Sequence, residues 1–564
     1  MSEKLLTVEE TAARLGISTA TVKRRAREGT LDAVKNGRNW VIRAAGLPSP
    51  VVPRTPRATG APSGLVDFNS ALRHLRDRDL QRDLWIPDVL RFEDDLNDVS
   101  WLTDAAAARI DGLAELDPAV PVPVPKSPIF LRNAVNLSLP DRLAYHAVVL
   151  AMAPALDAAV GTQAFAARLG NSRRFLKSDG AYARWKAAVK KKAEEVDGYV
   201  VETDVTAYFD CISHTVLMQE VRAVGVPAPL ADVLGRMLRT WGVAPGTGLP
   251  QGPDASRLLG NFYMKAVDDV MARIPGVSYF RYMDDVRIIA PSRHLAIRAL
   301  HQFDDECKQR GLVLSTKKTE LRTASAALAA LQDSALDDAQ YEFNHDESSA
   351  KSRRTLSDLF RAAINDDGTV NSRRARFSLY RLRALREKSV LSKVLSNLET
   401  VSGLGWNVAA YLAPWLTRPR VGDRIADYLE DPERNTADFL SSWLLAAIAD
   451  EPRSARPRLV NFARSRAFDR SQPSSQRAIA MQVTALGRQS SDLARLKAVV
   501  DREYDPGVVR GALVALRRVD RLDRTTADRA KRLPGMERTI QYLRAHDDLP
   551  SMLFGGQRAQ RLHG

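Results

Sequence analysis

Cysteine is nearly absent from this sequence, and so are long apolar runs. The 564 residues include two cysteines, Cys211 and Cys307, which excludes a disulfide framework and a cysteine-rich zinc site and favours a reducing compartment. No apolar run approaches the roughly 18 residues of a membrane-spanning helix. The first residues, MSEKLLTVEE, lack the basic-then-apolar layout of a signal peptide. Together these absences predict a cytoplasmic protein that has no membrane partner.

Acidic residues are too few to balance the basic ones. The chain has 83 Lys and Arg against 68 Asp and Glu, which gives a net charge of +15. In a chain of this size such an excess favours a polyanionic partner, for example a nucleic acid. The length exceeds that of a single hydrophobic core, so we expect several domains.

The N-terminal residues 1–45 have the pattern of a winged helix-turn-helix. Thr7 and Glu10 show capping-box spacing at the start of a first helix, a second helix follows, and a strand pair is expected to turn at Asn36-Gly37. Residues 46–64 carry prolines at short intervals and are typical of a linker.

Strand and helix signals divide the rest of the chain in two. Residues 65–325 combine helical periods with short apolar runs rich in β-branched and aromatic residues, such as YVVETDV and VRIIA, which are typical of strands. From 326 to 564 the strand signals stop, and segments of helical period alternate with short polar breaks. We therefore predict an α+β domain over 65–325 and an all-α array of helical hairpins over 326–564.

Carboxylates follow two of the predicted strands. VVETDVTAYFD places Asp204 at a strand end, and RYMDD later places Asp284 and Asp285 at another. Adjacent carboxylates raise each other's pKa, and Mg²⁺, which prefers oxygen ligands, would relieve the repulsion. A lone Asp-Asp pair is more often a surface turn, but the third carboxylate favours a two-metal site for phosphoryl transfer.

These motifs resemble those of reverse transcriptases. YMDD at 282–285 and DVTAYFD at 204–210 match the two metal motifs of the family, and GLPQGPDASRLLGNFYM at 248–264 matches the motif between them. PKSPIFLRNAVNLSLPDR upstream and CKQRGLVLSTKKTEL downstream resemble the flanking segments. The resemblance covers roughly residues 120–325, and it implies that the α+β domain is a right-hand polymerase core with fingers and palm.

The resemblance also implies roles for individual residues. Asp204, Asp284 and Asp285, helped by the Val205 carbonyl, would be catalytic and would hold two Mg²⁺ ions, with Mn²⁺ as an alternative. Phe209 would exclude a ribose 2′-hydroxyl, which makes DNA the product; the alternative is core packing. The remaining candidates contact the dNTP or the primer end: Lys126, Arg132, Phe209, Gln251, Gly252 and Lys318 for the nucleotide, and Tyr282 and Met283 for the primer terminus. Ser127 to Leu131 stand where the family usually has glycines between Lys126 and Arg132.

Two basic stretches are expected to contact an RNA or DNA template-primer. Residues 171–192 and 373–388 combine Lys and Arg with aromatic side chains. Basic side chains bind phosphates and aromatic rings stack on bases. The alternative for each stretch is a solvated helix face with an aromatic core stripe.

The chain also resembles bacterial defence-associated and abortive-infection reverse transcriptases, in which the polymerase core continues into an α-helical, HEAT-like region. This resemblance implies anti-phage defence by DNA synthesis. The resemblance also suggests two further modes of synthesis, one without a template and one primed by a protein tyrosine. The helical region offers several candidate tyrosines: Tyr380, Tyr411, Tyr428, Tyr504 and Tyr542.

The N-terminal unit resembles excisionase and MerR-type winged helix-turn-helix domains. Lys23, Arg24 and Arg27 would face operator DNA from the second helix, and Arg38 from the wing. Such modules also serve protein contacts. Two other readings stay open: a retron-like enzyme that copies a dedicated non-coding RNA, and a DNA-binding regulator with an idle polymerase fold. Template, primer, phage trigger and any homo-oligomer are not fixed by the sequence.

Overall fold

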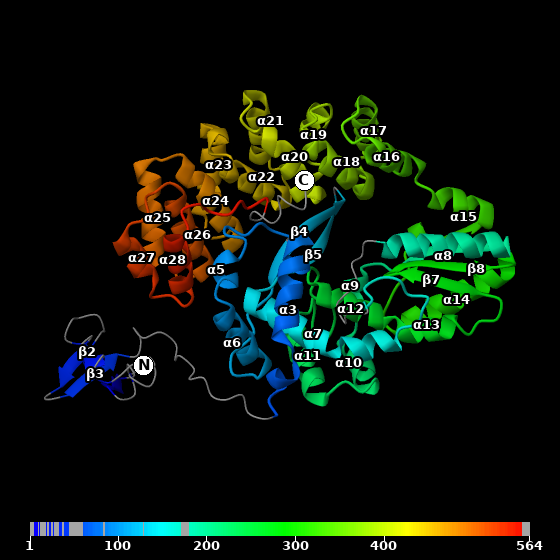
Figure 1. The fold of residues 1–564 in the computed structure, drawn as a ribbon, viewed down its shortest axis with the longest axis horizontal. Helices are drawn as coiled ribbons and strands as arrows, with labels where there is room; N and C mark the ends of the chain where they lie inside the picture. The colour runs from blue at the N-terminus through cyan, green and yellow to red at the C-terminus, as the bar shows by residue number, and fades with distance from the viewer. Residues whose placement is uncertain are drawn as a thin grey trace.

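The computed structural model describes residues 5–8, 11, 19, 22–23, 26, 33–36, 39–43, 60–82, 85–127, 129–170 and 180–554 (Figure 1). Within them the chain forms a small N-terminal sheet, a domain of helices around a four-stranded sheet, and a long array of helices.

The N-terminal sheet has three antiparallel strands in the order β1-β3-β2. Their bounds are Leu5–Thr7 for β1, Ala33–Asn36 for β2 and Asn39–Arg43 for β3. Asn36 pairs with Asn39, so the β2–β3 hairpin turns where Asn36-Gly37 predicts a turn. Strand β1 was not expected: it ends at Thr7, whose carbonyl accepts a hydrogen bond of 2.7 Å from the Thr11 hydroxyl. Glu10 of the predicted capping box lies outside the described residues.

The second domain is built on an antiparallel sheet of order β7-β8-β6-β9. Its strands are β6 (Tyr199–Asp204), β7 (Ser278–Tyr282), β8 (Asp285–Ala290) and β9 (Glu320–Thr323). Buried and partly exposed side chains alternate along β7 and over the first four residues of β8, as the period-two pattern predicts. The helices of this domain are α3 (Phe68–His74), α4 (Leu80–Arg82), α5 (Glu93–Leu96), α6 (Val99–Ile110), α7 (Leu139–Ala159), α8 (Ala181–Val196), α9 (Tyr208–Cys211), α10 (His214–Ala223), α11 (Ala228–Trp241), α12 (Asp254–Tyr263), α13 (Lys265–Met271) and α14 (Arg293–Gln309).

A separate hairpin, β4 (Val120–Ser127) and β5 (Phe130–Asn136), projects from this domain toward the helical array (Figure 1). Proline has no N–H for a sheet ladder and is confined to edge strands. Prolines at alternate positions of β4 are therefore tolerated because β4 pairs with β5 alone. The valines between them, Val122 and Val124, are buried.

The C-terminal helices stack in an arc above the β4–β5 hairpin (Figure 1). They are α16 (Ser334–His345), α17 (Ala350–Arg361), α18 (Ser372–Ala384), α19 (Leu391–Ser396), α20 (Trp406–Leu412), α21 (Pro419–Glu430), α22 (Phe439–Asp450), α23 (Pro457–Ala467), α24 (Ser474–Leu486), α25 (Ser490–Arg502), α26 (Pro506–Arg518), α27 (Arg524–Ala530) and α28 (Met536–Ala545). We call these helices, with their connections, the helical region. Its largely helical character is as predicted.

One helix crosses the division predicted at 325/326. Helix α15 (Ala324–Leu331) packs on α8 and on the sheet, and Ala324 and Ala327 share a buried cluster with Trp185. The packing therefore places α15 with the sheet. The sequence could not show this, because the helical period of α15 is the same whichever neighbour its apolar side contacts.

The hydrophobic core of the helical region includes residues from far earlier in the chain. Ile86, Val89 and Leu90, together with Val122 and Val124, belong to its buried cluster. These early residues thus share the core of the helical region, while the domain that carries the sheet has a second buried cluster of its own. This shared core was not expected from the sequence.

A partly buried ion-pair cluster attaches the other end of the arc to the second domain. Arg510 on α26 contacts Asp88 at 2.6 Å and Asp94 at 2.7 Å. The Thr539 hydroxyl on α28 donates to Asp94 at 2.7 Å. The helical region is therefore attached both at the hairpin and beside α5. None of the helices in the described parts of the chain has the length and apolar character needed to cross a membrane.

Candidate active site

The three candidate carboxylates meet at one end of the sheet. Asp204 is the last residue of β6 and pairs directly with Asp285, the first residue of β8. Asp285 also pairs with Tyr282, so Met283 and Asp284 form the two-residue turn between β7 and β8. The sequence placed Met283 in the strand, but its φ of +62° puts it in the left-handed region that strands do not use. The turn projects Asp284 beside the other two carboxylates.

The negative charge of this group is only partly balanced. Burial, followed by the fields of Asp204 and Asp285, raises the pKa of Asp284 to about 6. Asp285 is reached by solvent, yet the protein around it desolvates the carboxylate and raises its pKa, with Arg287 acting in the opposite direction. Lys318 supplies a cation in direct contact, with its Nζ 2.7 Å from Asp204.

Lys318 responds to the same charges. Partial burial lowers its pKa, but the hydrogen bond to Asp204 and the fields of the three aspartates outweigh this effect, and the pKa is raised. Lys318 therefore stays an ammonium ion at neutral pH. Its position shows that a cation is stabilised at the Asp204 carboxylate.

A metal ion fits this donor set, although no closed cage is formed. Among the described residues, no group of three or more His, Cys, Asp or Glu side chains encloses a metal position. Magnesium usually takes one or two protein carboxylates and completes its shell with water and substrate phosphates. Partly buried carboxylates with raised pKa and open access suit that open mode of binding.

A cavity of about 1180 Å³ lies over the carboxylates. It is lined by every candidate catalytic, nucleotide-contacting and primer-end residue: Lys126, Arg132, Asp204, Val205, Phe209, Gln251, Gly252, Tyr282, Met283, Asp284, Asp285 and Lys318. The structure thus brings together residues that the sequence separates widely. Their individual roles stay predictions.

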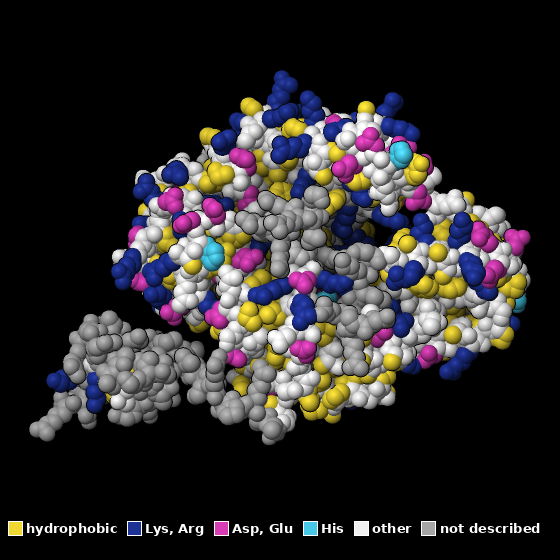
Figure 2. Space-filling model, viewed as in Figure 1, with side chains coloured by type: hydrophobic (Ala, Val, Ile, Leu, Met, Phe, Trp, Pro, Cys, Tyr) yellow, Lys and Arg dark blue, Asp and Glu magenta, His cyan; other side chains and the backbone are white. Residues whose placement is uncertain are grey.

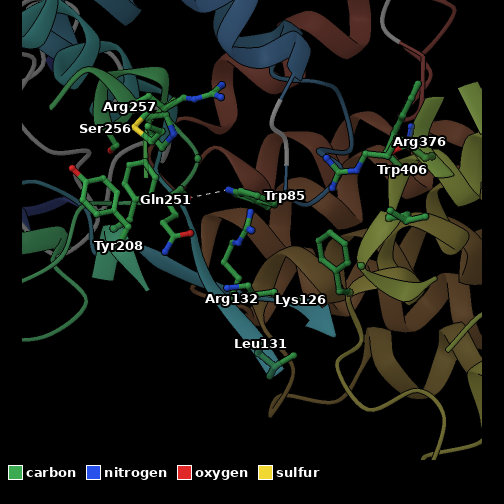
Figure 3. Close-up of a pocket in the computed structure, with 18 of the residues that line it drawn as sticks. Trp85, Lys126, Leu131, Arg132, Tyr208, Gln251, Ser256, Arg257, Arg376 and Trp406 are labelled. Atoms are coloured by element: carbon green, nitrogen blue, oxygen red, sulfur yellow. Dashed lines mark hydrogen bonds between the residues drawn. The ribbon is translucent and has the colours of Figure 1, made fainter. Parts of the chain in front are cut away.

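Gln251 is fixed at both its main chain and its side chain. Its carbonyl oxygen accepts hydrogen bonds from the Val135 amide at 3.0 Å and from Trp85 Nε1 at 2.9 Å (Figure 3). Its side-chain Nε2 donates to Asp210 at 2.5 Å. Gly252 follows with φ +141°, and a Cβ there would lie 2.7 Å from Trp85 Nε1. Glycine is therefore required by both the backbone conformation and the close approach of Trp85.

Asp210 was missed as a site residue. It lines the cavity, and burial raises its pKa, while Gln251, Arg132 and Asn133 act in the opposite direction. The only signal in the sequence was its place as the last letter of DVTAYFD. It connects the Gln251 side chain to the basic residues of the β4–β5 hairpin.

Phe209 both packs against the core and borders the cavity, while its exclusion of a 2′-hydroxyl stays a prediction. Its ring lies edge-on to Tyr208, with 5.5 Å between ring centroids, and a Cβ at Gly260 would lie 3.1 Å from it. The same residue lines the cavity. One side of the residue is therefore held by the core while it also borders the space above the carboxylates.

Comparison with known families agrees with this arrangement. Residues 131–355 match the model of the family reverse transcriptase (RNA-dependent DNA polymerase), and residues 5–47 match that of a helix-turn-helix domain. This chain carries a reverse transcriptase domain. The family match extends past β9 through α16, whereas the sequence resemblance was placed at 120–325.

The similarities to individual proteins are weak. Protein YkfC of Escherichia coli (strain K12) is 25% identical over 242 residues, which cover 36% of this chain and 61% of YkfC, so the chain spans under two thirds of that relative. The solved structure of telomerase from Candida albicans in complex with a TWJ fragment of telomeric RNA is 12% identical. It covers 73% of this chain and 75% of its own, with a TM-score of 0.29. A TM-score of this size does not establish a common fold.

The wall opposite the reverse transcriptase motifs comes from the helical region. Arg376, Tyr380 and Arg383 on α18 line the cavity with Trp406 of α20 and Trp443 of α22. Figure 3 shows Arg376 and Trp406 across the cavity from Gln251 and Tyr208. The sequence did not predict this wall.

The two basic stretches meet near the cavity. From residues 373–388, Arg376 and Arg383 line it, and Arg373 lies 4.6 Å from the ring of Tyr182 on α8. Of the other stretch, residues 171–179 lie outside the described residues. Figure 2 shows Lys and Arg side chains at the rim of the hollow between the helical region and the domain that carries the sheet.

The tyrosines and helix-turn-helix residues named above are placed as follows. Tyr380 lines the cavity, and Tyr504 is 83% exposed. The other candidate tyrosines, Tyr411, Tyr428 and Tyr542, are buried. Lys23 is helical and exposed, whereas the remaining DNA-contact candidates, Arg24, Arg27 and Arg38, lie outside the described residues.

Proposed function

We propose that this protein is an RNA-directed DNA polymerase that adds dNTPs to a primer by two-metal chemistry. The observation that carries the proposal is the pairing of Asp204 with Asp285 across adjacent strands, with Asp284 on the turn beside them. When bound, two Mg²⁺ ions would activate the primer 3′-hydroxyl and stabilise the leaving pyrophosphate. Mn²⁺ has the same preference for oxygen ligands.

The chain's own residues would supply the rest of the reaction. The three aspartates and the Val205 carbonyl would hold the ions, and Arg132 and Lys126 would bind the triphosphate. Lys318 would neutralise charge that develops on the pyrophosphate. Gln251 and Gly252 would position the nucleotide sugar.

Product identity and primer placement follow from the same cavity. Phe209 would leave no room for a 2′-hydroxyl, which selects deoxynucleotides. Tyr282 and Met283 would lie against the primer terminus. In this interpretation the β7-β8-β6-β9 sheet is the palm, the β4–β5 hairpin belongs to the fingers, and the HEAT-like helical region supplies the opposite wall.

The test is DNA synthesis from labelled dNTPs and Mg²⁺ with a panel of primer-templates, and also with no added nucleic acid. We expect labelled DNA from the wild type and none from Asp204→Asn or Asp284→Asn. Asp338→Asn, an exposed aspartate on α16, is the matched control and should retain full synthesis. Absence of DNA under every condition, including label attached to the protein itself, would exclude the proposal.

We further propose that this synthesis serves defence against phage. The support is the combination of a reverse transcriptase domain with a helical region that resembles defence-associated enzymes. Cells that carry the wild type should plate phage less efficiently than cells that carry Asp284→Asn. Equal plating across a broad phage panel would argue against this role. Sequencing of the nucleic acid that co-purifies with the protein would show whether it copies one dedicated RNA, as the retron-like alternative predicts.

A second candidate function, a DNA-binding regulator, is favoured by the helix-turn-helix match at 5–47 and by the exposed Lys23. Deletion of residues 1–45 separates the two. The polymerase proposal predicts that the deletion leaves primer extension intact. The regulator predicts that cellular function is lost on deletion but is retained in Asp284→Asn.

A further inference from the structure

Trp85 lines the cavity over the carboxylates, where the sheet-bearing domain, the β4–β5 hairpin and the helical region meet. It lies outside the residues matched by the reverse transcriptase family. Its indole Nε1 donates to the carbonyl oxygen of Gln251 at 2.9 Å, the contact drawn in Figure 3. Arg132 of β5 lies over its ring, 5.9 Å from the centroid. One side chain thus contacts the two segments proposed to bind the nucleotide.

The backbone of Trp85 is held by the helical region. Its carbonyl oxygen accepts a hydrogen bond of 3.2 Å from Trp443 Nε1 on α22. The residues that follow, Ile86, Val89 and Leu90, are buried in the core of the helical region. Arg510 holds the same segment through Asp88 at 2.6 Å.

Gln251 depends on this contact because it stands in a loop between elements. Two donors hold its carbonyl, the Val135 amide and Trp85 Nε1. Loss of the indole N–H would leave the Gln251 carbonyl with one of its two donors. The backbone of Gly252, which has no side chain to pack, would then be less restrained. The Gln251 side chain would then lose its alignment on Asp210.

We propose that Trp85 is a positioning residue: fixed by the helical region, it holds the Gln251 backbone so that nucleotide affinity depends on docking of that region. This inference rests on the proposed polymerase function. Removal of one well-placed hydrogen bond typically changes a binding equilibrium by roughly tenfold. We expect the effect on KM for the nucleotide, with kcat little changed.

The experiment uses the full-length protein with poly(rA)·oligo(dT), dTTP and Mg²⁺. Trp85→Phe keeps an aromatic ring but removes the donor, and we expect KM for dTTP to rise about tenfold. Trp443→Phe removes the donor to the Trp85 carbonyl and should raise KM in the same direction. The double variant should be no worse than Trp85→Phe, because Trp443 acts on the nucleotide through Trp85.

The matched control is Trp241→Phe. Trp241 is 1% exposed, and its Nε1 donates to the Asp117 carbonyl at 3.0 Å away from the cavity. This variant loses the same kind of bond and should unfold at a lower temperature, with KM unchanged. A second readout is the rise in Tm with added dTTP, which follows affinity without turnover; it should be smaller in Trp85→Phe than in the wild type.

The outcomes separate this inference from the proposed function. If the wild type makes no DNA with any primer-template, the polymerase proposal fails. If the wild type is active but Trp85→Phe and Trp241→Phe change KM equally, Trp85 is merely structural. Multiplicative effects of Trp85→Phe and Trp443→Phe would show that Trp443 acts independently, and the coupling would be rejected.

Discussion

The ammonium group of Lys318 lies 2.7 Å from the carboxylate of Asp204, the aspartate that β6 presents opposite Asp285. The ion pair links the short segment before β9 to the end of the sheet at which we propose that metal ions bind. Because more than half of the Lys318 side chain is exposed, the ion pair contributes little to folding. Its importance lies in the charge that it places over the cavity.

Lys318→Ala should therefore lower kcat far more than it lowers stability. If Lys318 neutralises or protonates the leaving pyrophosphate, its loss should reduce kcat by roughly 10²–10⁴-fold. Lys317→Ala removes an exposed neighbour of the same charge and should retain activity. Primer-extension kinetics and thermal unfolding check the two effects. Equal kcat in both variants would remove Lys318 from the mechanism.

Phe209→Val should relax the choice between deoxynucleotides and ribonucleotides. The smaller side chain opens the space expected to exclude the 2′-hydroxyl, and one apolar contact of this kind discriminates by roughly 10- to 200-fold. The measurement is kcat/KM for dNTP and rNTP on one primer-template. A fall in Tm with unchanged discrimination would show that Phe209 only packs against Tyr208.

Arg510→Met should weaken the attachment of the helical region to the second domain. The substitution leaves the carboxylates of Asp88 and Asp94 without their cation in a partly buried interface, which costs about 3–5 kcal/mol. Denaturant unfolding and limited proteolysis measure the loss. Arg524→Met, whose partner Asp528 lies at 3.8 Å on an exposed helix face, should cost less than about 1 kcal/mol. Comparable losses in both variants would contradict the assigned role of Arg510.

Stability should fall as the pH drops below about 6.5, in part through His74. Burial lowers the pKa of His74, while Asp254, 3.1 Å away, and Asp79 oppose the effect and His146 adds to it. The unfolded chain, with an ordinary histidine pKa near 6.5, then binds a proton that the folded chain does not. Acid therefore favours unfolding. The loss begins below pH about 6.5 and is complete below the lowered folded-state pKa.

His74→Gln removes the titrating group, so the variant does not take up this proton when it unfolds. The free energy of unfolding in urea, compared at pH 7.5 and 5.5, should depend less on pH in the variant than in the wild type. The same pH dependence in both proteins would assign the acid sensitivity to other groups.

The end of the sheet where the carboxylates meet could be predicted because its signals are local. Asp204 and Asp284 each come at the end of a short strand-like run, and the order of the motifs indicated that the two carboxylates lie together. The exact turn was not predictable: Met283 has the apolar character of a strand residue, and its left-handed backbone follows from tertiary pairing of Tyr282 with Asp285. Asp210 was visible in the motif but carried no distinguishing pattern.

The second wall of the cavity could not be predicted from periodicity. Trp85 and Trp443 are far apart in the chain, and nothing in either local pattern indicates that one donates to the other's carbonyl. The helical period predicted helices over 326–564 but not which of their faces would meet the hairpin. Shared cores between distant segments depend on tertiary packing, which overrides local signals.

The shared core also bears on how the protein is made. Ile86, Val89 and Leu90, near the start of the second domain, belong to the buried cluster that the helical region largely forms. A nascent chain that folds from its N-terminus on the ribosome leaves these apolar side chains without most of that cluster until the helical region has been synthesised. The cavity is therefore complete only once the helical region has been synthesised, and a chain cut short before that region would expose these apolar side chains to chaperones and proteases.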